Sequence, residues 1–212
     1  MTTACEIPTV QVVAADRLLT SPNFQFPDTF SPDGSQLVFD EQDGRTNFDV
    51  RMLSMDGKHA STPLLQTPFN EQNADLSPNG RWMAYQSDES GGRAEVYVRP
   101  YPNVNAGRRQ VSTSGGTRPL WSRDGRELFY LDAERRMTMV PVQTKSSFGV
   151  GSAQMLFDTR SFSLAGIGRN FDVSTDGARF LMVKDLPLPI DAKRLIVVQN
   201  WFEELRRLVP LK

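Results

Sequence analysis

The tetrapeptide Ser31-Pro32-Asp33-Gly34 decides the fold, because variants of it return three times along the chain. The copies are Ser77-Pro78-Asn79-Gly80, Ser122-Arg123-Asp124-Gly125 and Ser174-Thr175-Asp176-Gly177, and their serines follow one another at intervals of 46, 45 and 52 residues. An Asp-Gly or Asn-Gly pair supplies the positive φ angles of a tight hairpin, and the serine hydroxyl can bond the backbone nearby. Repeats of this length that hold several short strands are typical of a β-propeller.

The pattern of strands around each motif is similar from repeat to repeat. An inner strand runs into the motif, and further strands follow it. After the first three motifs we expect strands at 36–40, 48–55, 62–65, 81–86, 95–100, 109–112, 127–131, 137–142 and 154–157. In the last repeat we expect strands at 179–184 and 194–198, then a short helix at about 201–208. The sequence therefore predicts one all-β domain over 1–212, a propeller of about four four-stranded blades with a short C-terminal helix.

The two ends of the chain suggest how the ring is completed. Segment 11–19 has the pattern of a strand but no motif in front of it, whereas the last repeat lacks a fourth strand. Pairing between these ends would close the ring within one chain and remove an exposed edge. Four blades are few for a propeller, however. A partial ring completed by a second chain, as in a homodimer with eight blades, is the alternative.

Composition narrows the classes of partner. The chain has 212 residues, with 24 basic and 25 acidic side chains and a formal charge of −1. This balance of charge does not favour nucleic acid or an anionic membrane as a binding partner. Cys5 and His59 are alone of their kinds, which leaves no disulfide and no zinc motif. No signal peptide or apolar run of about 20 residues is evident, so we expect a cytoplasmic location by default.

Longer stretches around the motifs resemble a known family. Phe30-Ser-Pro-Asp-Gly-Ser-Gln-Leu-Val-Phe and the matching runs 76–85 and 121–130 are similar to TolB-like, WD-like propeller repeats. Segments 86–91, 95–102 and 200–208 resemble the C-terminal propeller of bacterial eukaryotic-like serine/threonine kinases, which is often extracytoplasmic and commonly has more repeats. The chain lacks the kinase motifs themselves. The resemblance therefore implies a non-catalytic module that senses a ligand or binds a protein.

Polar residues gather just before each motif, at the expected starts of the inner strands. Because inner strands converge on the central channel, we expect these residues to form a ligand site at one channel mouth. The two arginines favour an anionic or carbonyl-bearing ligand over calcium, the one metal that oxygen ligands here would suit. We therefore expect no resident cofactor. The candidate residues are Gln25, Asp28, Glu71, Gln72, Asn73, Thr117, Arg118, Arg169 and Asn170.

The alternative function is a hydrolase of the esterase, lactonase or phosphotriesterase type at the channel mouth. Such an enzyme would use either a calcium ion held by oxygen ligands in the channel, which is the more credible route, or a base. His59 is the one histidine available as a base, within an expected polar hairpin loop. No Gly-x-Ser-x-Gly motif accompanies it. We therefore expect binding rather than catalysis, with His59 as the weak catalytic candidate.

Overall fold

A computed structural model provides the fold and describes residues 17–145, 147–164 and 166–184. Its regular elements are strands, apart from a 3-10 turn, η1 (Val104–Ala106). The expected strand 194–198 and helix 201–208 lie outside the described residues, as does most of the expected strand 11–19. Residues 17–19 are described and belong to no strand. No helix in this part of the chain is long and apolar enough to cross a membrane.

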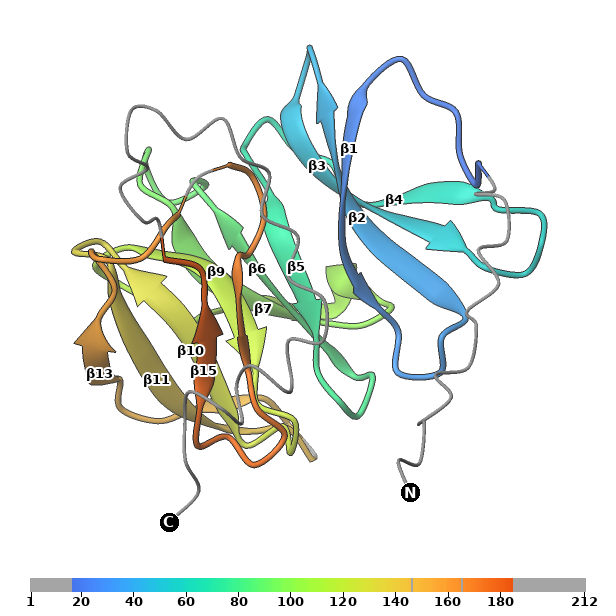
Figure 1. The fold of residues 1–212 in the computed structure, drawn as a ribbon. Coiled ribbons are helices and arrows are strands. Elements are labelled where there is room, and N and C mark those ends of the chain that lie inside the picture. Colours follow the sequence, from blue (N-terminus) through green and yellow to red (C-terminus); the bar gives the residue numbers. More distant parts are fainter. Residues whose placement is uncertain (1–16, 146, 165, 185–212) are drawn as a thin grey trace, which may run out of the picture.

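The strands form four antiparallel sheets that follow one another around an arc (Figure 1). The sheets are connected in the order of the sequence, each beginning with its inner strand. The first contains β1 (Phe24–Phe30), β2 (Gln36–Asp43), β3 (Asn47–Ser54) and β4 (Ser61–Leu65). The second contains β5 (Gln72–Leu76), β6 (Trp82–Ser87), β7 (Glu95–Pro100) and β8 (Arg109–Gln110). The third contains β9 (Gly116–Trp121), β10 (Glu127–Asp132), β11 (Arg136–Gln143), β12 (Gly149–Val150) and β13 (Gln154–Asp158).

The fourth sheet is described only in part. Its described part is the pair β14 (Phe171–Val173) and β15 (Phe180–Met182). Among the described residues no strand pairing joins this sheet to β1, so ring closure is not seen. The all-β fold and the succession of propeller-like sheets are confirmed.

The four motifs form the same turn, which explains why they recur. In the first, the Ser31 hydroxyl donates to Asp33 and accepts from the backbone N–H of Gln36 at 3.0 Å. The glycine N–H donates to the serine carbonyl, 2.8 Å away for Gly34. The same side-chain and backbone bonds occur around Ser77, Ser122 and Ser174. The motif aspartates therefore shape turns.

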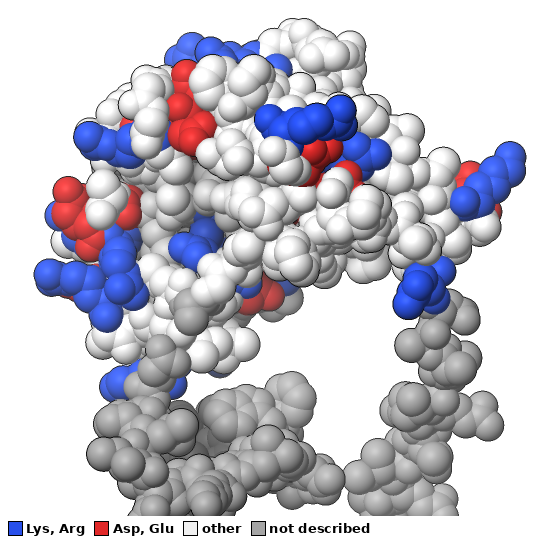
Figure 2. All heavy atoms as spheres, turned by 90° about the horizontal axis from the view of Figure 1, so that it is seen from above, with Lys and Arg blue, Asp and Glu red and all other residues white. Residues whose placement is uncertain are grey.

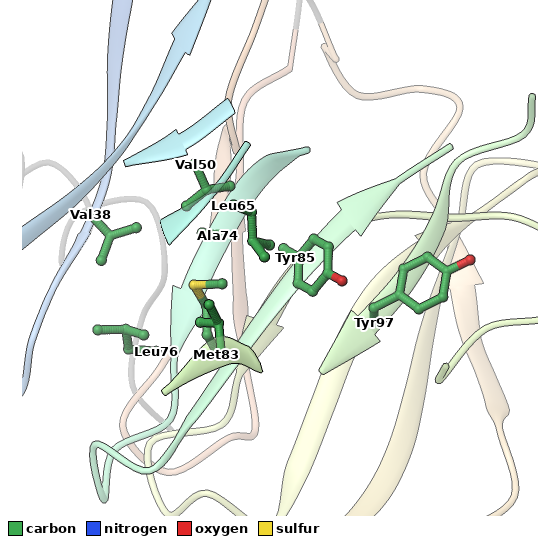
Figure 3. Packing of buried hydrophobic residues seen from close by; sticks show 9 residues of the cluster. Val38, Val50, Leu65, Ala74, Leu76, Met83, Tyr85 and Tyr97 are labelled. Carbon is green, nitrogen blue, oxygen red and sulfur yellow. The ribbon is translucent and has the colours of Figure 1, made fainter. Parts of the chain in front are cut away.

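Apolar side chains pack between successive sheets and hold the arc together. Val38 and Val50 of the first sheet meet Leu76, Met83 and Tyr85 of the second in one buried cluster (Figure 3). A second cluster joins the second and third sheets, and a third joins the third and fourth. Because each sheet buries a face against its neighbour, the inner strands β1, β5, β9 and β14 are brought around a common channel.

Prolines of the motifs add a contact between neighbouring sheets at one end of the channel. Pro32 Cγ lies 3.6 Å from the position that a Cβ at Gly80 would occupy, and Pro78 Cδ lies 3.4 Å from the corresponding position at Gly125. The third motif carries Arg123 in place of proline. The Cβ position at Gly177, in the fourth motif, has no heavy atom within 4 Å. The contact between adjacent motifs is thus interrupted between the third and fourth sheets.

Candidate ligand-binding site

A pocket of about 320 Å³ opens where the inner strands end, beside the motifs. All four sheets contribute to its wall. Of the nine candidate residues, Arg169 is among the lining groups and the other eight are not. The lining residues are Thr29, Phe30, Pro32, Asp75, Leu76, Pro78, Leu120, Trp121, Ser122, Arg123, Arg169 and Asp172.

Arg169 links three sheets across the channel. It precedes β14, and its Nη1 donates to the carbonyl of Pro119 in β9 at 2.9 Å. Its Nη2 lies 3.5 Å from Oδ1 of Asp75 in β5. Its charge also lowers the pKa of Asp28 in β1, against stronger opposing effects. Because both charged side chains of the Arg169–Asp75 pair are largely buried, loss of either one would leave an uncompensated charge.

Asp75 is a buried carboxylate that sequence reasoning missed. Its Oδ2 accepts the backbone N–H of Trp121 at 2.8 Å, and its carbonyl accepts the indole N–H of the same tryptophan at 3.1 Å. Burial raises the pKa of Asp75, although Arg169 opposes this effect. Asp75 thus fixes Trp121 and Arg169 around the pocket.

Asp28 of β1 and Asp40 of β2 form an acidic pair where the first sheet contacts the second. Burial, the charge of Asp40 and a hydrogen bond between the two carboxyls raise the pKa of Asp28 well above its usual range. Burial also raises the pKa of Asp40. Asp28 accepts the N–H of Ala74 at 3.3 Å, and Asp40 accepts that of Asn73 at 2.9 Å. The pair retains a proton at pH values where an exposed aspartate is fully ionised.

Asn73 and Arg118 have the same backbone role in successive sheets. Each lies four residues before a motif serine, with a φ of 55° and 53° respectively, in the left-handed region. The N–H of Asn73 is held by Asp40, and that of Arg118 by Oε1 of Gln86 at 2.9 Å. A side chain of the preceding sheet therefore stabilises an unusual conformation at the start of each inner strand.

The Arg118 side chain is used within the protein. Its Nε donates to the carbonyl of Gly168 at 2.8 Å, and its Nη2 donates to the carbonyls of Gly166 and Leu164 at 3.1 and 3.3 Å. These bonds tie β9 to the connection before β14. Burial lowers the pKa of Arg118. Arg118 therefore organises the upstream end of the channel with its Nε and Nη2 donors already engaged.

Most of the remaining candidate residues also contact neighbouring strands or loops. Glu71 is buried, accepts the Thr67 hydroxyl and has a pKa raised by burial to about 7. Side-chain bonds join Gln25 to Glu41, Gln72 to Gln86, Thr117 to the Leu131 carbonyl and Asn170 to the Ser163 carbonyl. These polar residues connect strands and loops, so their polarity has a structural explanation.

Arg123 and Asp172 are pocket residues that sequence reasoning passed over. Arg123 Nη2 lies 3.2 Å from Asp172 Oδ2, and about half of each side chain is exposed. The replacement of proline by Arg123 in the third motif was the signal that could have identified this position. The pocket thus contains two guanidinium groups and two carboxyls beside an apolar wall.

His59 lies apart from this pocket, in the hairpin between β3 and β4. Its Nδ1 is 3.2 Å from the carbonyl of Ser54, an acceptor, so Nδ1 carries the proton. Across the described residues no group of three or more histidine, cysteine or acidic side chains could hold a metal ion. Among the acidic channel residues, Asp75 is already paired with Arg169, which makes its carboxylate a poor ligand for calcium.

The surface charge is mixed. On the face shown in Figure 2, basic and acidic side chains are interspersed. This mixture agrees with the nearly neutral composition and offers no broad electrostatic footprint on that face for a polyanion.

Comparison with known proteins extends the assignment of fold. No protein-family model matches the sequence, and no curated protein matches it. In structure, the chain is similar to a TolB protein of Agrobacterium tumefaciens, with a TM-score of 0.59, 18% identity and coverage of 79% of this chain and 61% of that one. It is also similar to TolB of Acinetobacter baumannii, with a TM-score of 0.59, 13% identity and coverage of 78% and 39%.

A third similar structure is a puromycin-hydrolysing peptidase of Mycobacterium tuberculosis, with a TM-score of 0.53, 17% identity and coverage of 73% and 27%. The chain thus spans less than two thirds of the length of each of these proteins. At these identities the likeness concerns the fold alone. It shows that the chain has a TolB-like β-propeller fold.

Proposed function

We propose that this protein is a non-catalytic sensing module that binds a small ligand in the channel pocket, akin to the sensor propeller of a bacterial receptor kinase. The observation that carries the proposal is the convergence of four inner strands on one pocket that holds Arg123, Arg169 and an apolar wall. A concave site in which charged and polar groups converge beside some apolar side chains can hold a small molecule in one orientation. The motif turns hold these groups on a rigid frame.

A binding screen with a blocked variant tests this function. Small molecules are screened by thermal shift against the wild type, against Thr29→Trp, which places a large ring in the pocket, and against Thr62→Trp. Thr62 lies exposed on β4, outside the pocket, and is the matched control. We expect compounds that stabilise the wild type and Thr62→Trp but not Thr29→Trp. Absence of any compound with this profile would contradict the proposal.

Catalysis is tested with the same variants. A non-catalytic module turns over p-nitrophenyl acetate no faster than the uncatalysed background. Turnover that is lost in Thr29→Trp or in His59→Ala would replace the proposal by the hydrolase alternative.

We also propose that a second copy of the chain completes an eight-bladed ring. The described sheets form an arc, and apolar side chains are exposed on its first and last sheets. Phe24 on β1 is 73% exposed and Leu181 on β15 is 66% exposed. The mass of the native particle tests this: a dimer supports the closed ring, and a monomer at micromolar concentration contradicts it.

A further inference from the structure

The third motif has a different residue from the first two at its second position, and this residue, Arg123, lines the channel pocket. Pro32 and Pro78 each pack towards the glycine of the next motif. Arg123 takes the corresponding position in the third motif and instead lines the pocket, as Pro32 and Pro78 also do. The motif position that carries a packing proline in the first two motifs thus carries a guanidinium group at the pocket edge in the third.

Arg123 is available to a ligand. Its side chain is 56% exposed and its described ion pair, with Asp172, is equally open to solvent. Exposed ion pairs of this kind contribute little to stability. Arg123 can therefore leave Asp172, or bind it and a ligand together, with little loss of stability. Arg169, in contrast, is held by Asp75 and the Pro119 carbonyl.

The neighbouring wall is apolar. Phe30 is 55% exposed at the end of β1, and Pro32, Leu76, Pro78 and Leu120 line the same pocket. An exposed aromatic ring beside prolines offers a face for an apolar or aromatic group. A ligand that uses both features has one charged end and one apolar body.

The charges of the pocket favour a single negative charge on the ligand. Arg123 and Arg169 supply two positive charges, but Asp75 and Asp172 lie in the same wall. A dianion such as phosphate would meet both carboxyls, whereas one carboxylate can accept two parallel N–H bonds from one guanidinium. The negative charge of Asp75 is already balanced by Arg169, whose Nη2 lies 3.5 Å from its Oδ1.

We propose that the pocket binds a small organic acid with an apolar or aromatic body, and that Arg123 recognises its carboxylate. This inference rests on the proposed function, since it names the ligand class of the same pocket. Arg169 adds positive charge and keeps Asp75 in place, while Phe30 and the two prolines contact the apolar body.

Calorimetric titration of the full chain with three probes tests the inference. The probes are 4-phenylbutyrate, its neutral analogue 4-phenylbutyramide and inorganic phosphate. The proteins are the wild type, Arg123→Gln, Arg123→Pro and Arg126→Gln. Arg126 is the matched control, because it is exposed, pairs with Asp124 and lies outside the pocket. Arg123→Pro restores the residue of the first two motifs, and Arg123→Gln serves if that variant does not fold.

We expect the carboxylate to bind the wild type and Arg126→Gln equally, and both Arg123 variants at least tenfold more weakly. The amide and phosphate should bind the wild type at least tenfold more weakly than the carboxylate. Equal binding of carboxylate and amide, tighter binding of phosphate, or no effect of Arg123→Gln would overturn the inference. In those cases the Thr29→Trp screen still decides the proposed function. If no compound in either experiment requires the pocket, both fail.

Discussion

Replacement of Asp28 by asparagine should make the protein more stable at neutral pH and flatten its dependence on pH. In the folded protein, burial and Asp40 raise the pKa of Asp28, whereas an aspartate in the unfolded chain ionises near pH 3.9. An acidic group whose pKa is higher in the folded protein than in the unfolded chain does not lower the unfolding free energy at pH values below its unfolded pKa. The loss of unfolding free energy grows as pH rises towards the folded pKa, because the unfolded chain releases a proton that the folded protein retains.

One retained proton corresponds to about 1.4 kcal/mol of unfolding free energy per pH unit, over the range in which the unfolded chain has released the proton and the folded protein has not. The asparagine side chain in Asp28→Asn carries no such proton, and its amide oxygen can still accept the N–H of Ala74. Urea unfolding at pH 5, 6 and 7 measures the difference between wild type and Asp28→Asn. Asp56→Asn, in an exposed hairpin where Asp56 accepts the N–H of Lys58, is the control and should follow the wild type.

The result that refutes this reasoning is an unchanged slope. If Asp28→Asn loses stability with pH as steeply as the wild type does, Asp28 does not hold a proton that the unfolded chain releases, and the slope belongs to other groups such as Asp40. A uniform loss of stability at all three pH values would show that Asp28 contributes through its carboxylate bonds instead.

Three further predictions concern the frame around the channel. Gly116→Ala should lower the unfolding free energy, measured by urea titration, by about 1–3 kcal/mol, because the new Cβ would lie 2.7 Å from Cβ of buried Ser112. Gly44→Ala is the control and should change the unfolding free energy little, because the space around Gly44 is open. Ser122→Ala should cost about 1–3 kcal/mol, since the buried hydroxyl accepts the N–H of Glu127, and a near-neutral result would deny the turn its stabilising role. Calcium or a chelator should leave the melting temperature unchanged, and stabilisation by calcium would contradict the poor fit of the channel to a cation.

Local chemistry made much of the fold predictable from the sequence. The tetrapeptide turn closes through bonds within six residues, so its recurrence reveals the repeats directly. Strand 95–100 was predicted with its observed bounds, and most others within one to three residues. The expected strand 109–112 ends at Gln110, because the buried Ser112 hydroxyl turns back to accept the N–H of Val96.

The site was harder to predict, because its residues depend on contacts between sheets. The residues two positions before the four motif serines all line the pocket, namely Thr29, Asp75, Leu120 and Asp172. The sequence-based candidates were taken from positions further upstream, so Asp75 was not identified as a channel residue. Arg118 was recognised as polar and close to the channel, but its bonds to the connection before β14 became evident only in three dimensions.

The channel now has two ends with different roles. At the upstream end, polar side chains hold backbone groups of the next sheet and are largely engaged. At the motif end, Arg123 and Phe30 are exposed beside a pocket. Specific binding is therefore expected where groups remain available to a ligand.

A map of amide and indole chemical shifts during titration with 4-phenylbutyrate shows directly whether the ligand binds in the channel pocket. Binding in the channel pocket predicts saturable changes at the indole N–H of Trp121 and at the amides of Arg123 and Asp172, all of which disappear in Thr29→Trp. Saturable changes that lie elsewhere, such as around His59, and persist in Thr29→Trp would contradict it.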